Sequence, residues 1–171
     1  MIVLPNAINI RNLIDDLRII SWEAADILLG YSSLIKKTKY KNKIITSKEN
    51  EDPVTLADLK VNEMIIQRLK EKYKHIDWEI LSEENVKTDS YNCDTNANWV
   101  WVLDPLDGTK DFIQSTGNYA MHLALNYKNK PLIGLVLIPE KDELWISNGE
   151  EVWCEKRSGS KFKPNVSSYK E

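Results

Sequence analysis

The amino-acid sequence predicts an α+β fold, in which an antiparallel β-sheet has two helices packed on one face. Two segments with apolar residues at helical spacing come first along the chain, and most segments of strand-like composition follow them. The later strand-like segments are separated by short turns, which is typical of an antiparallel meander. Helices that precede the strands in this way favour an α+β class over alternating βαβ units.

The two helices are predicted from the spacing of their apolar residues. The first runs from residue 9 to about 36, with apolar positions at Ile10, Leu13, Ile14, Leu17, Ile20, Ala24, Ile27 and Leu28. A short strand is expected at 44–46. The second helix follows Thr55, with apolar positions at Val61, Met64, Ile65 and Leu69. Thr55 is expected to cap this helix, and Asp58, three positions later, would complete a capping box.

Six strands are predicted after the second helix. They cover residues 79–82, 99–104, 119–127, 132–138, 143–147 and 152–155. Pro105 removes a backbone donor and is expected to end the second of these strands. A short helix is expected at 110–114, and Asn148-Gly149 is a strong hairpin signal. His122, inside the third strand, is expected to be packed and hydrogen-bonded rather than catalytic.

The composition is that of a single globular domain. The chain has 171 residues, of which 29% are charged and 42% hydrophobic. A net charge of −3 argues against a nucleic-acid-binding surface or a polybasic membrane anchor. The longest apolar run, 132–138, is too short to span a membrane, and the apolar N-terminus is too short for a signal sequence. The sequence therefore predicts a cytoplasmic protein and leaves peripheral membrane association open.

One apolar segment ends abruptly in two carboxylates and a tight turn. Asp104 and Asp107 lie on either side of the Leu106 carbonyl group, and the backbone N–H groups of Gly108 and Thr109 follow at the start of a short helix. Hard oxygen ligands beside N–H groups at a helix start suit a magnesium ion in contact with a phosphate. A solvated Asp-Gly turn is the alternative interpretation of this segment taken alone.

Two earlier segments carry further acidic residues. Asp58 ends the sequence Pro-Val-Thr-Leu-Ala-Asp, where capping of the helix is its ordinary role. Glu83 and Glu84 follow a short apolar segment and a serine, and paired acids of this kind are usually a solvated loop. In chain order, however, the sequence contains Pro-Val-Thr-x-Ala-Asp, then Ser-Glu-Glu, then Asp-Pro-Leu-Asp-Gly-Thr.

This ordered set resembles the magnesium-dependent, lithium-sensitive phosphatase superfamily that includes inositol monophosphatase and 3′(2′),5′-bisphosphate nucleotidase. Among its branches, the sequence looks most like the bacterial CysQ type of bisphosphate nucleotidase. The similarity extends from about residue 13 to about 163. It implies the first half of a layered αβαβα fold, Mg²⁺ as cofactor and a small phosphorylated substrate.

The resemblance implies a set of metal ligands. Glu83, Asp104 and the Leu106 carbonyl oxygen would hold the first magnesium ion. Asp104 would bridge to a second ion, which Asp107 would also bind. Two such ions can neutralise the charge of a phosphate monoester and acidify a bound water molecule. The implied site is therefore one for hydrolysis of a phosphate ester.

The resemblance also implies catalytic and substrate-binding residues. Asp58 and Thr109 would orient and deprotonate the attacking water, with Glu84 close to this network. The backbone amides of Gly108 and Thr109 would hold the phosphate at the start of the short helix. Lys48 is the basic residue favoured near the substrate, because it precedes the Pro-Val-Thr element.

The implied reaction removes the 3′-phosphate of adenosine 3′,5′-bisphosphate by direct attack of metal-activated water and leaves AMP. An inositol monophosphatase, or a phosphatase for another small ester, is the enzymatic alternative. Family members carry a further αβ domain with a Trp-Asp-x-Ala-Ala element that completes the second metal site, and this sequence contains no Trp-Asp dipeptide. Residues 1–171 are therefore expected to be the N-terminal metal-binding domain alone. An inactive remnant, self-association, or a partner chain that supplies the missing half is the second hypothesis.

Overall fold

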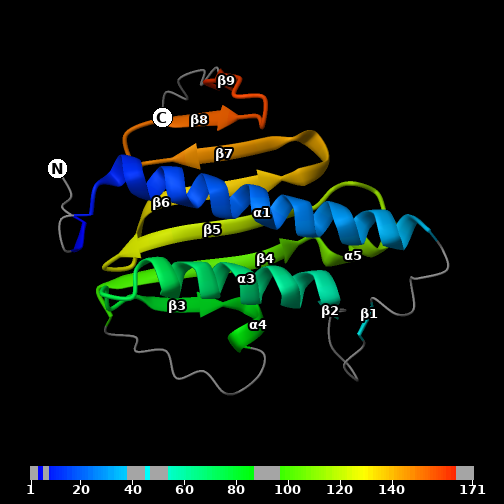
Figure 1. Ribbon diagram of the computed structural model, residues 1–171, viewed down its shortest axis with the longest axis horizontal. Coiled ribbons are helices and arrows are strands. Elements are labelled where there is room, and N and C mark those ends of the chain that lie inside the picture. Colours follow the sequence, from blue (N-terminus) through cyan, green and yellow to red (C-terminus); the bar gives the residue numbers. More distant parts are fainter. Residues whose placement is uncertain (1–3, 6–7, 38–44, 47–53, 87–96, 165–171) are drawn as a thin grey trace, which may run out of the picture.

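The computed structural model describes residues 4–5, 8–37, 45–46, 54–86 and 97–164. Helices α1 (Ile10–Lys36) and α3 (Leu56–Lys72) pack against each other on one face of a seven-stranded sheet, as Figure 1 shows. The strands follow chain order across the sheet: β3 (Glu79–Ser82), β4 (Trp99–Asp107), β5 (Ala120–Tyr127), β6 (Lys130–Ile138), β7 (Glu143–Ser147), β8 (Val152–Glu155) and β9 (Lys161–Phe162). The shorter elements are β1 (Ile45–Thr46), β2 (Val54–Thr55), α4 (Glu83–Val86), α5 (Thr109–Gln114) and the 3₁₀ turn η3 (Pro139–Lys141).

The predicted α+β class is confirmed, with one difference in the sheet. Strands β4 to β8 form the expected antiparallel meander, and β9, which was not predicted, extends it, whereas β3 and β4 run parallel to each other. Antiparallel neighbours can be joined by a tight hairpin, but parallel neighbours need a longer connection. The segment between β3 and β4 provides that length and contains α4. The sheet is therefore mixed rather than wholly antiparallel.

The capping residues at both long helices are of the preferred kind. At α1, the Asn9 side chain accepts hydrogen bonds from the backbone N–H groups of Arg11 and Asn12, at 2.8 and 3.4 Å. At α3, Thr55 and Asp58 form the expected capping box. Each cap satisfies N–H groups that have no partner inside the helix. The cap of α3 is important for the site because it fixes the Asp58 side chain.

Pro105 does not end β4, contrary to the sequence expectation. The strand continues to Asp107, which pairs with Ala120, and the register shifts between Asp104 and Asp107. A bulge of this kind lets a strand accommodate a proline, because the residue without an N–H group leaves the regular ladder. The irregularity therefore lies between the two aspartates, and each of them remains paired with a residue of β5, Asp104 with His122 and Asp107 with Ala120.

The core lies between the two long helices and the face of the sheet that they cover. Trp101, Leu123 and Leu125 point to this face and are fully or almost fully buried, as is Leu17 of α1. The alternate residues of the strands are only partly buried. On that opposite face, a groove of about 810 Å³ is lined mainly by apolar side chains, among them Val102, Ala124, Val136 and Trp145, and it reaches Glu83, Asp104 and His122 at one end.

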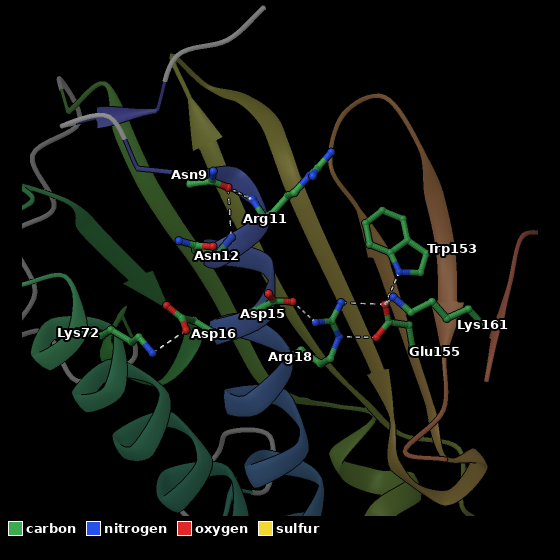
Figure 2. Close-up of polar contacts among 10 residues, drawn as sticks. All are labelled: Asn9, Arg11, Asn12, Asp15, Asp16, Arg18, Lys72, Trp153, Glu155 and Lys161. Carbon is green, nitrogen blue, oxygen red and sulfur yellow. Dashed lines mark hydrogen bonds and ion pairs between the residues drawn. The ribbon is translucent and has the colours of Figure 1, made fainter. Parts of the chain in front are cut away.

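A largely buried ion pair connects α1 to β8, the second-last strand of the sheet, as Figure 2 shows. The Arg18 guanidinium donates two hydrogen bonds to Glu155, whose side chain is only 4% exposed. Trp153 Nε1 and Lys161 Nζ contact the same carboxylate at 2.6 and 2.9 Å. Burial opposes ionisation of Glu155, but the hydrogen bonds from Arg18, Lys161 and Trp153 outweigh it and lower the pKa to about 2.

In the described ranges, no helix is long and apolar enough to cross a lipid bilayer.

Candidate active site

The parallel pairing of β3 and β4 brings two acidic residues together. Ser82 is the register partner of Leu103, so Glu83 and Asp104, the residues that follow them, lie next to each other where β3 ends. The two carboxyl groups are close enough for the charge and a side-chain hydrogen bond of Glu83 to contribute to the raised pKa of Asp104. The structure thus places these two predicted ligands side by side.

Asp104 lies in surroundings that disfavour its ionised form. Burial, followed by the charge and the hydrogen bond of Glu83, raises the pKa of Asp104 well above its usual value. The Leu106 N–H group, which donates to Asp104 Oδ1 at 3.1 Å, opposes this shift only in part. A divalent cation would remove the repulsion between the two carboxylates, and their hard oxygens suit Mg²⁺. The donor set therefore fits the metal that the sequence implies.

Asp107 is set apart from this pair. Its side chain is 61% exposed, and its Oδ2 atom lies 4.0 Å from Nε2 of His122. Within the described ranges, no three His, Cys, Asp or Glu side chains are already gathered as a set that could hold a metal ion. The structure therefore brings together Glu83 and Asp104, and it leaves Asp107 at the rim.

His122 does not have the packed environment expected from its strand. It is the register partner of Asp104 across β4 and β5, and its side chain is 44% exposed. Directly opposed residues of neighbouring strands share one face of the sheet, so the imidazole lies beside the acidic residues. Alternation along β5 predicts which residues share a face with His122, but only the register with β4 shows that Asp104 lies opposite.

Asp58 uses its two carboxylate oxygens differently. Its Oδ2 atom accepts hydrogen bonds from the backbone N–H and the hydroxyl group of Thr55. Its Oδ1 atom lies 3.4 Å from Oγ1 of Thr109, which also donates to the Leu106 carbonyl oxygen at 3.1 Å. The capping role and the predicted role at the site are therefore compatible, because each uses a different oxygen.

Burial makes Asp58 a more basic carboxylate than an exposed aspartate. The residue is only 2% exposed, and burial raises its pKa to about 6, against the opposing hydrogen bonds from Thr55. The charge of Glu84, itself a buried residue, adds to the increase. A pKa near neutrality suits a group that accepts a proton. Lys48, the predicted substrate contact, lies outside the described residues.

Gly108 occupies a turn that only glycine fits. It has φ 82° and precedes α5, and its carbonyl oxygen accepts a hydrogen bond from the Phe112 N–H group at 2.9 Å. A Cβ atom at this position would lie 2.8 Å from the carbonyl oxygen of Asn118, too close for any real side chain. The turn that carries Thr109 therefore lies in close contact with the backbone at Asn118, just before β5.

Gly108→Ala should destabilise the protein by about 3 kcal/mol, since it combines left-handed strain with a backbone clash. Gly159→Ala is the matched control, because Gly159 has φ 84° but a Cβ atom there would have nothing within 4 Å. It should cost only about 1 kcal/mol, the strain alone. Urea unfolding of both variants measures the difference, and equal losses would contradict the close approach to Asn118.

The fold and the site together define a class of protein. A mixed sheet carries neighbouring carboxylates where β3 ends beside β4, a partly buried contact between Asp58 and Thr109, and a short helix preceded by glycine, and this is an oxygen-rich arrangement that suits a divalent cation. The chain belongs to the inositol monophosphatase family, whose model matches residues 12–169.

Curated relatives carry two kinds of name. A 3′(2′),5′-bisphosphate nucleotidase CysQ from Buchnera aphidicola is 33% identical over 124 residues, which cover 71% of this chain and 44% of that protein. An inositol monophosphatase from Dictyostelium discoideum is also 33% identical, over 134 residues that cover 74% of this chain and 45% of that protein. The chain thus spans less than half the length of these relatives.

Solved structures share the fold. The extragenic suppressor protein suhB from Bartonella henselae superposes with a TM-score of 0.66 at 20% identity, covering 90% of this chain and 52% of that one. Inositol monophosphatase II from Staphylococcus aureus gives a TM-score of 0.59 at 26% identity, covering 84% of this chain and 48% of that one. The similarity again extends over about half of each solved chain.

Proposed function

We propose that this chain carries the metal-binding part of a magnesium-dependent phosphomonoester hydrolase. The observation that supports it best is the gathering of Glu83 and Asp104 by the parallel strands β3 and β4. These two side chains and the Leu106 carbonyl oxygen would hold one Mg²⁺ ion, and Asp107 would contribute with Asp104 to a second. When bound, the ions would neutralise phosphate charge and acidify a water molecule.

Asp58 and Thr109 would handle the proton of the attacking water. The Thr109 hydroxyl group has one proton and two acceptors in reach, the Leu106 carbonyl oxygen and Asp58 Oδ1. If the Leu106 oxygen were a metal ligand, Asp58 Oδ1 would be the better acceptor for the Thr109 proton. Thr109 Oγ1 would then be able to accept a hydrogen bond from water. Because Thr55 holds the other oxygen of Asp58, the acceptor is already oriented.

For the substrate, we propose a 3′(2′),5′-bisphosphate nucleotide, with adenosine 3′,5′-bisphosphate hydrolysed to AMP and phosphate. The bisphosphate nucleotidases among the relatives support this choice. The equally similar inositol monophosphatase supports the alternative, a small inositol or sugar phosphate. The amides of Gly108 and Thr109 would contact the phosphate in either case, and Lys48 would add positive charge.

Completion of the site is part of the proposal. The chain spans less than half the length of its relatives, and the apolar groove on the sheet reaches the carboxylates. We propose that further polypeptide covers this groove and supplies the remaining ligand. The competing interpretation is an inactive remnant that retains only metal or phosphate binding.

The test is phosphate release by the purified chain in Mg²⁺, with adenosine 3′,5′-bisphosphate and inositol 1-phosphate as parallel substrates, with and without Li⁺. We expect lithium-sensitive release that favours the nucleotide and falls at least about 100-fold in Asp107→Ala. Asp107 is exposed, so its removal should leave the fold intact. Preference for the inositol ester would support the alternative substrate. No release from folded, magnesium-binding protein would contradict activity of this chain alone.

A second pair of variants separates chemistry from binding in the same assay. Thr109→Ala should reduce turnover more than it reduces magnesium affinity, because the hydroxyl group acts on the water. Thr109→Ser keeps the hydroxyl group and should retain most of the turnover. A parallel loss of turnover and of magnesium affinity in Thr109→Ala would mean that Thr109 only supports the Leu106 carbonyl group.

A further inference from the structure

One carboxylate oxygen outside the site collects three hydrogen bonds. Oε1 of Glu140, in η3, accepts from Ser32 Oγ at 2.8 Å, Lys36 Nζ at 3.0 Å and Tyr119 Oη at 3.1 Å. Ser32 and Lys36 belong to the last turns of α1, and Tyr119 directly precedes β5. Burial opposes ionisation of Glu140, but the hydrogen bonds from Lys36, Ser32 and Tyr119 hold its pKa below the usual value. The three donors are thus joined by an ionised acceptor.

Tyr119 connects this cluster to the turn that presents Thr109. The residue is 4% exposed, and its ring packs edge-to-face against Phe112 of α5, with the centroids 4.8 Å apart. The Phe112 N–H group is bonded to the Gly108 carbonyl oxygen, and a Cβ atom on Gly108 would lie 3.4 Å from Cα of Tyr119. A displacement of Tyr119 would therefore move the turn, since no free space separates them.

Small movements of this turn matter because Thr109 has two competing acceptors. Its hydroxyl oxygen lies 3.1 Å from the Leu106 carbonyl oxygen and 3.4 Å from Asp58 Oδ1. A shift of a few tenths of an ångström would change which of them receives the proton. Misplacement of a catalytic group by about 1 Å can cost roughly 100-fold in rate.

We propose that Glu140 is a positioning residue that fixes the Gly108–Thr109 turn by holding the hydroxyl group of Tyr119. Hydrogen bonds to an ionised acceptor are stronger than neutral ones, which suits one oxygen that orients three donors from separate elements. The Glu140 side chain is 26% exposed, so solvent moderates the effect. The catalytic consequence rests on the proposed phosphatase function, whereas the coupling of Glu140 to the turn does not.

The test that needs no activity is hydrogen exchange at the Phe112 amide, whose bond to Gly108 closes the first turn of α5. Tyr119→Phe and Glu140→Ala should each accelerate exchange about fivefold, the effect of one partly exposed hydrogen bond. Glu140→Gln keeps an acceptor oxygen without the charge and should fall between Glu140→Ala and the wild type. The double variant Tyr119→Phe/Glu140→Ala should exchange no faster than either single variant, because both remove the same link.

Tyr73→Phe is the matched control. The Tyr73 hydroxyl group donates to Asp16 Oδ2 at 2.6 Å, so this variant also loses one tyrosine–carboxylate bond, but between α1 and the end of α3. It should leave exchange at Phe112 unchanged. Additive effects in the double variant, or an equal acceleration by Tyr73→Phe, would overturn the proposal, because either result would report general destabilisation.

Kinetics provide the second readout. If the wild type hydrolyses adenosine 3′,5′-bisphosphate, Tyr119→Phe and Glu140→Ala should lower kcat about fivefold with little change in KM, since the turn would orient the proton acceptor. Tyr73→Phe should leave both constants unchanged. A rise in KM with constant kcat would overturn the positioning role. Absence of hydrolysis by the wild type would instead contradict activity of this chain alone, and the exchange experiment would still decide the coupling.

Discussion

Asp104→Asn should abolish magnesium binding and leave the metal-free protein at least as stable as the wild type. The asparagine keeps the oxygen that accepts the Leu106 N–H group, but it removes the charge that Glu83 repels. Relief of that repulsion should add about 1 kcal/mol to the free energy of unfolding, after allowance for partial exposure. The Asp104 carboxylate would also be one of the ligands of the proposed magnesium site, so loss of its charge should remove magnesium binding.

Thermal unfolding with and without Mg²⁺ measures both effects. A ligand at 100 times its Kd stabilises a protein by about 2.7 kcal/mol, and this increment should be present in the wild type and absent in Asp104→Asn. Asp26→Asn is the control, because Asp26 lies on α1, is 65% exposed and changes the net charge equally. If Mg²⁺ stabilised Asp104→Asn as much as it stabilises the wild type, the assignment of Asp104 as a ligand would be contradicted.

The pH dependence of the metal-free protein gives an independent check. The folded state raises the pKa of Asp104, so it binds more protons than the unfolded state between the two pKa values, and stability increases as the pH falls through that interval. The difference in the free energy of unfolding, by which Asp104→Asn exceeds the wild type, should therefore be largest above neutral pH. It should disappear near pH 4, where Asp104 of the wild type is protonated in the folded protein. An advantage independent of pH would mean that its cause is not the charge of Asp104.

Glu155→Ala should cost about 3 kcal/mol of stability, because it leaves the partly buried Arg18 without its main partner. The matched control is Glu151→Ala, which breaks an exposed pair with Lys163 and should cost less than about 1 kcal/mol. Adding Arg18→Met to Glu155→Ala should recover part of the loss, since the unpaired charge is then removed. Urea unfolding at neutral pH compares the three variants, and equal losses for Glu155→Ala and Glu151→Ala would contradict a buried ion pair.

The contribution of Glu155 should also vary with pH. Its pKa is lowered to about 2 in the folded protein, against 4.5 for an ordinary glutamate, so the stabilisation is present above about pH 4.5 and decreases as the pH falls towards 2. The difference between the wild type and Glu155→Ala should shrink over that interval. A constant difference between pH 2 and 7 would mean that the cost comes from lost packing rather than from the charge.

The sequence predicted the elements well because their signals are local. The limits of α1, the cap of α3 and the limits of β7 and β8 follow from residues within a few positions of each boundary. The direction of β3 relative to β4 has no such signal, because a short apolar strand has the same sequence pattern in a parallel and in an antiparallel pair. The proximity of Glu83 and Asp104 depends on that direction. Before the structure, it therefore rested only on the family resemblance.

Two further differences have the same origin in non-local structure. Pro105 was expected to end β4, but pairing with β5 on the far side of the bulge extends the strand to Asp107. His122 was expected to be packed, but it lies on the sheet face that α1 and α3 do not cover. Neither the continuation of a ladder nor the covering of a face can be inferred from one strand considered alone.

The two oxygens of Asp58 imply that this residue and Asp107 would have different evolutionary histories. One Asp58 oxygen caps α3, so a lineage that had abandoned catalysis would still retain this aspartate for folding. The Asp107 side chain is 61% exposed, and its Oδ2 atom lies 4.0 Å from Nε2 of His122. Mutational drift would thus reach Asp107 first. Inactive descendants of such a domain would be recognised by substitution at Asp107, whereas the presence of Asp58 would say nothing about their activity.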